Sequence, residues 1–523
     1  MSATTHAAPA AGHGMETRRM VAFLSMVFGM FMAILDIQIV SASLAEIQAG
    51  LAASSDEISW VQTSYLIAEV VMIPLSGFLS RALSTRWLFA ASAAGFTVMS
   101  FMCATATSIE QMILYRALQG FLGGGMIPTV FAAAYSVFPR EKQPIVAPMI
   151  GLVATLAPTI GPTVGGYLTD LFSWHWLFLV NVVPGIFVIL LTVTLVDFDE
   201  PDFSLLDRFD WWGLLFMAGF LGSLEYVLEE GPTNDWFEDN SILVFAIVCA
   251  VSSVAFFARV LMASHPVVDI KAFVNRNFAI GSAFSFVLGI GLYGLTYLYP
   301  IFLGRVRGYS ALQIGETMFV TGVAMFLTAP IAGRLMTRLD PRVMMGIAFA
   351  GFALGTWWIT FITKDWDFWE LVIPQVLRGT SLMLAMIPIN NISLGTLPPD
   401  QLKNASGLFN LTRNLGGAVG LALINTVLNH RWDLHLARLH ESVQWGSAAA
   451  VERLDGLTAT FSALGSNATD AALKQLALLV RQQALVMAFA DVFALLTVLF
   501  LCLVAAAPLM RRPKPGTGGS GGH

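Results

Sequence analysis

Charged residues and cysteine are scarce in this chain, and each shortage limits what the protein can be. Only 12% of the 523 residues are charged, about half of what a soluble domain carries. The three cysteines, Cys103, Cys249 and Cys502, lie far apart in apolar runs, so they predict neither a disulfide framework nor a metal site. Because 56% of the residues are hydrophobic, we expect an all-α polytopic membrane protein.

Patterns for nucleotide binding and for catalysis are also missing. The sequence has no Walker-type loop, no glycine-rich dinucleotide turn after a strand, and no nucleophile spaced near a base. We therefore expect no enzyme activity, no cofactor, no metal and no nucleic-acid partner. If the chain moves a solute uphill, the energy has to come from an ion gradient, and a proton gradient is the natural choice.

Long apolar runs are what the chain has in quantity. About fourteen of them reach the ~20 residues that cross a bilayer. They begin near Met20, Ile58, Trp87, Gln111, Ile145, Trp176, Trp211, Ile242, Phe278, Gln313, Val343, Trp369, Ala405 and Leu485. The expected surroundings of the chain are therefore membrane lipid.

The distribution of lysine and arginine predicts how the chain is oriented. Short loops on one side hold only Arg305, Arg307 and Lys364, whereas the other side holds most of the remaining basic residues. The positive-inside rule then places both termini in the cytoplasm. One cytoplasmic loop, residues 197–210, is acidic and fits this pattern poorly.

Two neighbouring spans carry residues that are costly or unusual in a bilayer. The first contains Arg116, and an arginine inside a span costs at least ~2.5–3.5 kcal/mol unless it faces a partner or a wet cavity. The second is rich in glycine and proline, which allow a close helix contact and a bend. Its residues of this kind are Gly151, Pro158, Gly161, Pro162, Gly165 and Gly166.

These two spans resemble motifs of the major facilitator superfamily. Arg116-x-x-Gln119-Gly120 is similar to the fourth span of that family, and Gly161-Pro162-x-x-Gly165-Gly166 to the fifth-span motif of drug:proton antiporters. The resemblance covers nearly the whole chain and is greatest to the EmrB/QacA family of fourteen-span exporters. It implies proton-driven export of amphipathic drugs across a bacterial inner membrane. It also implies a periplasmic EmrA-like adaptor and a TolC-like outer-membrane channel as partners.

An internal repeat supports the architecture that the resemblance implies, which is two six-helix bundles plus two inserted helices. Met126-Ile-Pro128 recurs as Met386-Ile-Pro388, as expected for two related bundles with substrate bound between them. The inserted helices could instead be a peripheral scaffold without a role in coupling. The predicted parts are a disordered tail (1–17), the N-terminal bundle (18–197), a linker with the inserted spans (198–277), the C-terminal bundle (278–510) and a second tail (511–523).

Two carboxylates inside the spans are candidates for proton coupling. Asp36 lies in a first-span stretch that resembles the family's LDxTIVN signature, with Gln38 in place of threonine. Intramembrane ionisable residues usually mark function, although a structural polar contact remains open for Asp36. Glu69, near the centre of the second span, belongs to no motif that we identify. A functional carboxylate and a satisfied interhelical hydrogen bond are both open for it.

Polar residues at matching places in the two halves are candidates for a central cavity. We expect this role for Gln38, Gln119, Arg378, Asn390 and Arg413. Arg413 could instead extend toward the cytoplasmic headgroups. A loop that resembles the family's cytoplasmic gate carries Arg81 where the family usually has an acid, so a charge-relay gate is in doubt.

Residues 429–484 are predicted to form a long periplasmic loop with two amphipathic helical pieces. A loop of this length is usually functional or disordered. It could face an adaptor, or it could rest on its own bundle. The whole pattern predicts an antiporter in which Asp36 takes up a proton and Arg116 competes for the carboxylate. The alternative is a membrane sensor on the same scaffold that binds a small molecule without moving it.

Overall fold

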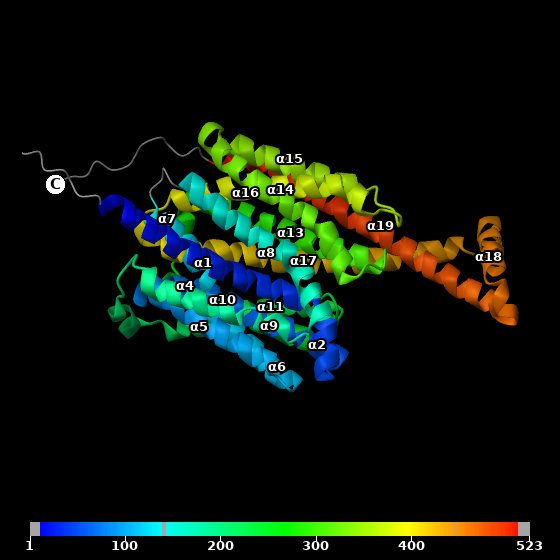
Figure 1. Ribbon diagram of the computed structural model, residues 1–523, viewed down its shortest axis with the longest axis horizontal. Coiled ribbons are helices and arrows are strands. Elements are labelled where there is room, and N and C mark those ends of the chain that lie inside the picture. The colour runs from blue at the N-terminus through cyan, green and yellow to red at the C-terminus, as the bar shows by residue number, and fades with distance from the viewer. Residues whose placement is uncertain (1–10, 139–142, 445, 511–523) are drawn as a thin grey trace, which may run out of the picture.

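The computed structural model describes residues 11–138, 143–444 and 446–510, and helices make up nearly all of them (Figure 1). These described residues include no strand, as the sequence predicts. The predicted disordered tail covered residues 1–17, but α1 already begins at Ala11, so residues 11–17 are helical.

Most of the helices are long. They are α1 (Ala11–Ala42), α4 (Trp60–Ala82), α5 (Ser84–Ala104), α6 (Ile109–Gly123), α7 (Met126–Val137), α8 (Gln143–Leu171), α10 (Val182–Leu195), α11 (Trp211–Glu230), α12 (Asn240–Met262), α13 (Arg276–Arg305), α14 (Ala311–Arg338), α15 (Pro341–Ile359), α16 (Phe368–Gly395), α17 (Pro399–Ser442) and α19 (Ala468–Ala506). The shorter ones are α2 (Leu44–Leu51), α3 (Ser55–Ile58), α9 (Trp176–Leu179) and α18 (Ala448–Thr460).

The number of spans differs slightly from the prediction. In the described part of the chain, 12 helices are long and apolar enough to cross a membrane, or up to 13 if the bent α8 is one span. The remaining predicted span is α17, which packs along α13 and α4 inside the bundle. Its many asparagine, arginine and glycine residues lower its hydropathy, so α17 does not pass the same test, although the sequence predicts a span beginning near Ala405.

Several helices begin at capping residues that fix their start. Ser310 and Gln313 form a reciprocal capping box at α14, and Asp367 forms one with Glu370 at α16. The side chain of Asn275 accepts two backbone hydrogen bonds at the start of α13. Each cap satisfies N–H groups that have no partner inside the helix. The predicted starts of these spans fall within a few residues of the caps.

Helix α8 lies between the two halves, against α1 on one side and α14 on the other. Its contact with α1 is very close. A Cβ atom at Gly161 would stand 2.3 Å from Cβ of Gln38, and one at Gly165 would stand 2.9 Å from the carbonyl oxygen of Ile39. The helix is bent by 46° between its two parts. The glycines therefore allow the approach of α1, and the prolines remove hydrogen bonds where the helix bends.

The bundle is closed at the end where α1 begins and α19 ends, which we call the terminal end. There α4 of the first half meets α17 of the second. A Cβ atom at Gly77 would stand 2.9 Å from Cα of Asn404. Lys403 of α17 donates to the carbonyl oxygen of Ser80 and forms an ion pair with Asp199. These contacts join the two halves across the terminal end.

The acidic segment that fits the charge rule poorly is explained by these contacts. Asp197 pairs with Arg86 at 2.6 Å, and Asp199 accepts the backbone N–H of Thr85 in addition to its pair with Lys403. The acids therefore neutralise basic residues of neighbouring elements at the same end. The loop that resembles the cytoplasmic gate carries Arg81 in place of its usual acid, but Asp199 of the later segment lies beside this loop at Thr85.

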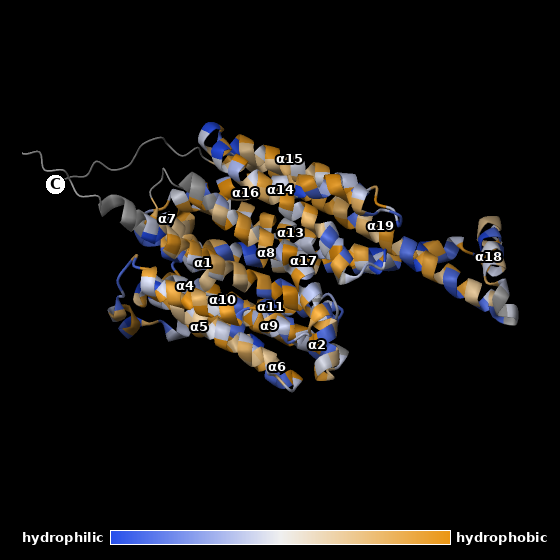
Figure 2. Cartoon of the chain, viewed as in Figure 1, coloured by the Kyte–Doolittle hydropathy of each residue, from blue (hydrophilic) through white to orange (hydrophobic). Residues whose placement is uncertain are grey.

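The two helical pieces predicted in the loop at 429–484 are found as the ends of α17 and α19, and the segment between them adds the helix α18, so the loop is more helical than predicted. Figure 1 shows α17 and α19 continuing beyond the bundle at its other end, here called the distal end, to the short helix α18. Figure 2 shows hydrophilic and hydrophobic residues mixed along this extension, in contrast to the more uniformly apolar bundle. At its base, Asp491 pairs with Arg431 at 2.9 Å and lies 2.7 Å from His435. The extension therefore projects from the bundle and does not rest on it.

Candidate functional site

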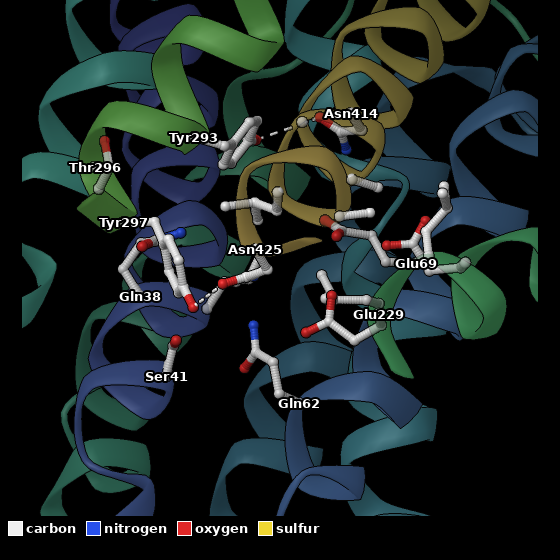
Figure 3. Close-up of a pocket in the computed structure, with 18 of the residues that line it drawn as sticks. Gln38, Ser41, Gln62, Glu69, Glu229, Tyr293, Thr296, Tyr297, Asn414 and Asn425 are labelled. Atoms are coloured by element: carbon white, nitrogen blue, oxygen red, sulfur yellow. Dashed lines mark hydrogen bonds between the residues drawn. The ribbon is translucent and has the colours of Figure 1, made fainter. Parts of the chain in front are cut away.

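A cavity of about 440 Å³ lies between the two halves (Figure 3). Its wall comes from α1, α4, α8 and α11 on one side and from α13, α14 and α17 on the other. All of these helices contribute residues from the part nearer the distal end. Since the terminal end is closed by α4 and α17, the cavity belongs to the distal half of the bundle.

The wall combines apolar surface with a few polar groups. Apolar side chains include Leu66, Val70, Ile301, Ile314 and Leu421. In Figure 3, Tyr293 and Tyr297 lie on one side of the cavity, and Glu69 and Glu229 lie on the other. Such a mixture suits an amphipathic ligand, because the apolar surface supplies affinity and the polar groups fix orientation.

Glu69 is the predicted coupling residue that reaches this cavity. It is only 3% exposed, and its Oε1 atom has no hydrogen-bond partner within the described residues. The alternative reading of Glu69, a satisfied interhelical hydrogen bond, is therefore not seen for that oxygen. A buried carboxylate oxygen without a partner is costly, and a proton or a cation would relieve the cost.

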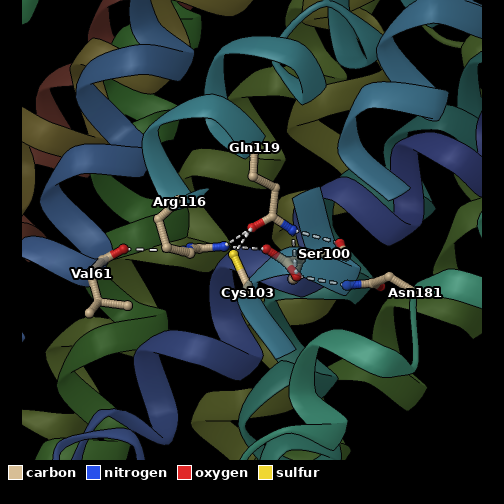
Figure 4. A network of polar contacts seen from close by, with 7 residues as sticks. Val61, Ser100, Cys103, Arg116, Gln119 and Asn181 are labelled. Carbon is tan, nitrogen blue, oxygen red and sulfur yellow. Dashed lines mark hydrogen bonds and ion pairs between the residues drawn. The ribbon is translucent and has the colours of Figure 1, made fainter. Parts of the chain in front are cut away.

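Asp36 and Arg116 form a fully buried ion pair. Figure 4 shows the network of polar contacts around Arg116. Both side chains are 0% exposed, and Nη1 of Arg116 lies 2.7 Å from Oδ2 of Asp36. The same Nη1 donates to Gln119 at 2.7 Å, and Nε donates to the carbonyl oxygen of Val61 at 3.1 Å. Asn181 donates to the other carboxylate oxygen at 2.7 Å. The polar residues of the first half thus meet in one network.

This network satisfies the charges almost completely. The guanidinium also lies over the ring of Tyr65, 4.2 Å from its centroid, which adds a cation–π contact. Only Nη2 of Arg116 lacks a partner in the part of the chain that the structure describes. Removing one member of such a pair leaves the other charge buried and costs about 3–5 kcal/mol. The arginine is therefore tolerated in the membrane because it faces a carboxylate, as the sequence predicts.

Asp36 and Arg116 do not line the cavity in this structure. Their neighbours Ile37 and Gln38 do, so the pair lies directly behind the α1 wall. Arg116 also reaches α4, the helix that carries Glu69, by donating to the carbonyl oxygen of Val61. The three predicted coupling residues are thus brought together, with one at the cavity and two behind it.

Of the five residues expected in the central cavity, Gln38 is found on its wall, and the other four are not. Gln119 is fully buried in the ion-pair network. Arg378 donates to Thr296, and its guanidinium lies 5.5 Å from the Tyr299 ring centroid. Asn390 is buried in α16.

Arg413 also lies behind the wall, which corrects the two predictions made for it. It donates to Asn410 and sits over the ring of Phe131, 5.0 Å from the centroid. Only 4% of it is exposed, so it does not extend toward headgroups. Its neighbour Asn414 is the residue of this turn that faces the cavity.

The residues of the α8 motif are divided between packing and the cavity. Pro162 lines the cavity, whereas Gly161 and Gly165 contact α1. A Cβ atom at Gly151 would meet Ile387 of α16 at 3.7 Å, so this glycine faces the second half. Pro158 and Gly166 are buried. The motif therefore serves contacts with both halves.

Sequence reasoning missed two carboxylates on the inserted helix α11. Glu225 and Glu229 both line the cavity, and Glu225 is 6% exposed. The inserted helix is therefore not a mere peripheral scaffold at its distal end. The available signal was a pair of glutamates four residues apart at the end of an apolar run, which places them on one helix face.

Comparisons with known proteins agree with this architecture. The model of the Major Facilitator Superfamily matches residues 26–421, and the chain belongs to that superfamily. The colistin resistance protein EmrB of Acinetobacter baumannii is 42% identical over 94% of this chain and 96% of its own length. The multidrug export protein EmrB of Escherichia coli K12 is 29% identical over 94% of this chain and 95% of its own. The predicted resemblance to EmrB-type exporters is confirmed.

Solved structures share the fold at low sequence identity. The human organic anion transporter TETRAN has a TM-score of 0.57 and 13% identity, covering 92% of this chain and 99% of that chain. A bacterial homologue of the lysosomal transporter Spinster, inward-facing and occupied, has a TM-score of 0.52 and 15% identity, covering 95% and 99%. The predicted fold, that of the Major Facilitator Superfamily, is thereby confirmed.

Proposed function

We propose that this protein exports amphipathic drugs in exchange for protons by alternating access. The observation that carries the proposal is the Glu69 carboxylate at the cavity wall, whose Oε1 atom has no partner among the described residues, together with the buried Asp36–Arg116 pair behind the α1 wall. The names of the relatives, colistin resistance protein and multidrug export protein, support drugs as the cargo.

The coupling follows from competition for charge. A proton on Glu69 removes the cost of its buried charge, and a cationic group of the cargo does the same. Because each ligand lowers the affinity for the other, release of one favours binding of the other, as antiport requires. Arg116 serves as the internal counter-charge: Asp36 holds it in this conformation, and it contacts α4, the helix that carries Glu69, at the carbonyl oxygen of Val61.

Alternating access requires the terminal end to open when the cavity closes on the distal side. In this structure the terminal end is held by Lys403, which joins α17 to Ser80 and Asp199. The contact of α8 with α14 of the second half is a surface over which the halves can rock, and Gly161 and Gly165 hold α8 against α1 within the first half. The structure therefore represents one of the two states that the cycle needs.

The orientation follows from the basic residues at the terminal end. We place both termini in the cytoplasm and the distal end toward the periplasm of a bacterial inner membrane. The extension formed by α17, α18 and α19 then projects into the periplasm. It is the natural contact for an EmrA-like adaptor that passes cargo to a TolC-like channel.

Proteoliposomes test the proposal directly. The purified protein should move ethidium, a cationic amphipath, against its gradient when a pH gradient is applied, and Glu69→Gln should abolish this transport. Glu316→Gln is the matched control, because that carboxylate is on an exposed face of α14 and does not line the cavity. Counterflow of labelled ethidium separates the alternatives, since a sensor that only binds its ligand cannot exchange it across the bilayer.

A further inference from the structure

The inserted helix α11 is fixed against α4 so that one of its faces turns to the cavity. Trp60 stacks on Tyr226, with ring centroids 5.4 Å apart. A Cβ atom at Gly222 would meet Ile67 at 3.4 Å, so the two helices lie close together. This packing aims Glu225 and Glu229, which are four residues apart, into the cavity.

The charge of the cavity wall is one-sided. It contains the carboxylates of Glu69, Glu225 and Glu229, and no lysine, arginine or histidine is among its lining residues. Within the described ranges, the side chains of Glu225 and Glu229 form no hydrogen bond or ion pair with another residue. Glu69 adds an independent sign of a ligand, because it is buried on another helix with an oxygen that lacks a partner.

The rest of the wall indicates what kind of cation would fit. The rings of Tyr293 and Tyr297 face the carboxylates across the cavity, and tyrosine rings attract cations. Apolar side chains fill much of the remaining surface. In the described residues no group of histidine, cysteine, aspartate and glutamate could hold a metal ion. The features together favour a flat organic cation over an inorganic one.

We infer that the cavity binds organic dications, and that Glu225 and Glu229 of the inserted helix hold one positive group while Glu69 faces the other. The biological role of this site rests on the proposed export function, whereas the binding itself does not. The inserted pair of helices is thereby part of the cargo site, and it sets the preference for two charges over one.

Binding to the purified full-length protein in nanodiscs tests this inference. The probes are methyl viologen, a two-ring dication, and N-methyl-4-phenylpyridinium, a two-ring cation of similar size with a single charge. The wild type should bind the dication at least ~10-fold more tightly, because a desolvated charge pair contributes at least that much. The double variant Glu225→Gln/Glu229→Gln should lose this preference.

Glu230→Gln is the matched control. Glu230 is the next residue of α11, it accepts a hydrogen bond from Thr63 at 2.9 Å, and it does not line the cavity. The control should keep the preference for the dication. The single variant Glu229→Gln, which changes the less buried carboxylate, serves if the double variant does not fold, and it should reduce the preference partly.

Equal affinities for the two probes in the wild type would overturn the inference, as would an unchanged preference in a folded double variant. Transport is measured separately in proteoliposomes. Selective binding without pH-driven transport would refute the proposed export function and leave the dication site standing. Transport of ethidium without any preference for the dication would refute the dication site and leave the proposed export function standing.

Discussion

The Asp36–Arg116 pair allows a double-mutant cycle whose outcome follows from the burial of both groups. In Asp36→Asn the guanidinium of Arg116 stays buried and loses its counter-charge, which should cost about 3–5 kcal/mol in the free energy of unfolding. The acceptor for Asn181 is retained by the amide oxygen, so most of the loss is electrostatic.

The reverse substitution, Arg116→Gln, should cost less. The remaining carboxylate of Asp36 can take up a proton and become neutral, whereas a guanidinium cannot lose one at ordinary pH. In the double variant both partners are neutral and can still exchange a hydrogen bond. The cycle should therefore give a coupling energy of about 2–3 kcal/mol, near the top of the range for contacting residues.

Unfolding of the purified protein in mixed micelles with increasing SDS, followed by tryptophan fluorescence, measures this cycle. The control is the pair Arg431–Asp491 at the base of the extension, where both side chains are partly exposed, 42% and 30%. Its coupling energy should not exceed ~1 kcal/mol. Additive costs at Asp36 and Arg116 would refute the reasoning, because they would mean that the two charges do not depend on each other.

Three further outcomes follow from other contacts. Gly165→Leu should cost about 1–3 kcal/mol by overpacking against α1 and should block export in proteoliposomes, whereas Gly346→Leu, where nothing lies within 4 Å of the added Cβ, should leave both unchanged. Lys403→Glu should weaken the closure of the terminal end and reduce export. The charge exchange Lys403→Asp with Asp199→Lys should restore part of the export activity. No rescue by this exchange would argue against a role of the Lys403–Asp199 ion pair in closure. Replacing residues 443–467 by a short glycine-serine linker should leave proteoliposome transport intact but abolish drug resistance in cells. Full resistance of such cells would mean that this part of the extension is not needed for contact with an adaptor.

The sequence predicted the frame of the molecule because hydrophobic runs report lipid contact directly. Thirteen of the fourteen predicted starts fall within or next to a helix that passes, alone or as the bent α8, the test for spanning length and apolarity. The other helix, α17, packs inside the bundle, where asparagine and arginine find partners, so it is less apolar than the helices that pass the test. Its extension past residue 429 continues as helix because no proline or glycine interrupts it before Ser442.

The candidate site was only partly predictable. A lone acid and a lone arginine in apolar spans predict a buried contact, and the structure shows that contact between Asp36 and Arg116. Whether a polar residue faces a cavity or the core of its own half depends on helix rotation, which hydropathy does not encode. Arg378 and Arg413 therefore lie behind the wall, and Glu225, at the end of an inserted span, lies on it.

The proposed transport mechanism depends most on the exchange of a proton for cargo at Glu69, and release of protons on ligand binding measures that exchange directly. Ethidium is added to the purified protein in weakly buffered detergent solution, and a pH-sensitive dye reports the protons that appear. We expect release from the wild type and from Glu316→Gln, and none from Glu69→Gln. The same release from Glu69→Gln as from the wild type would show that Glu69 does not exchange its proton for cargo.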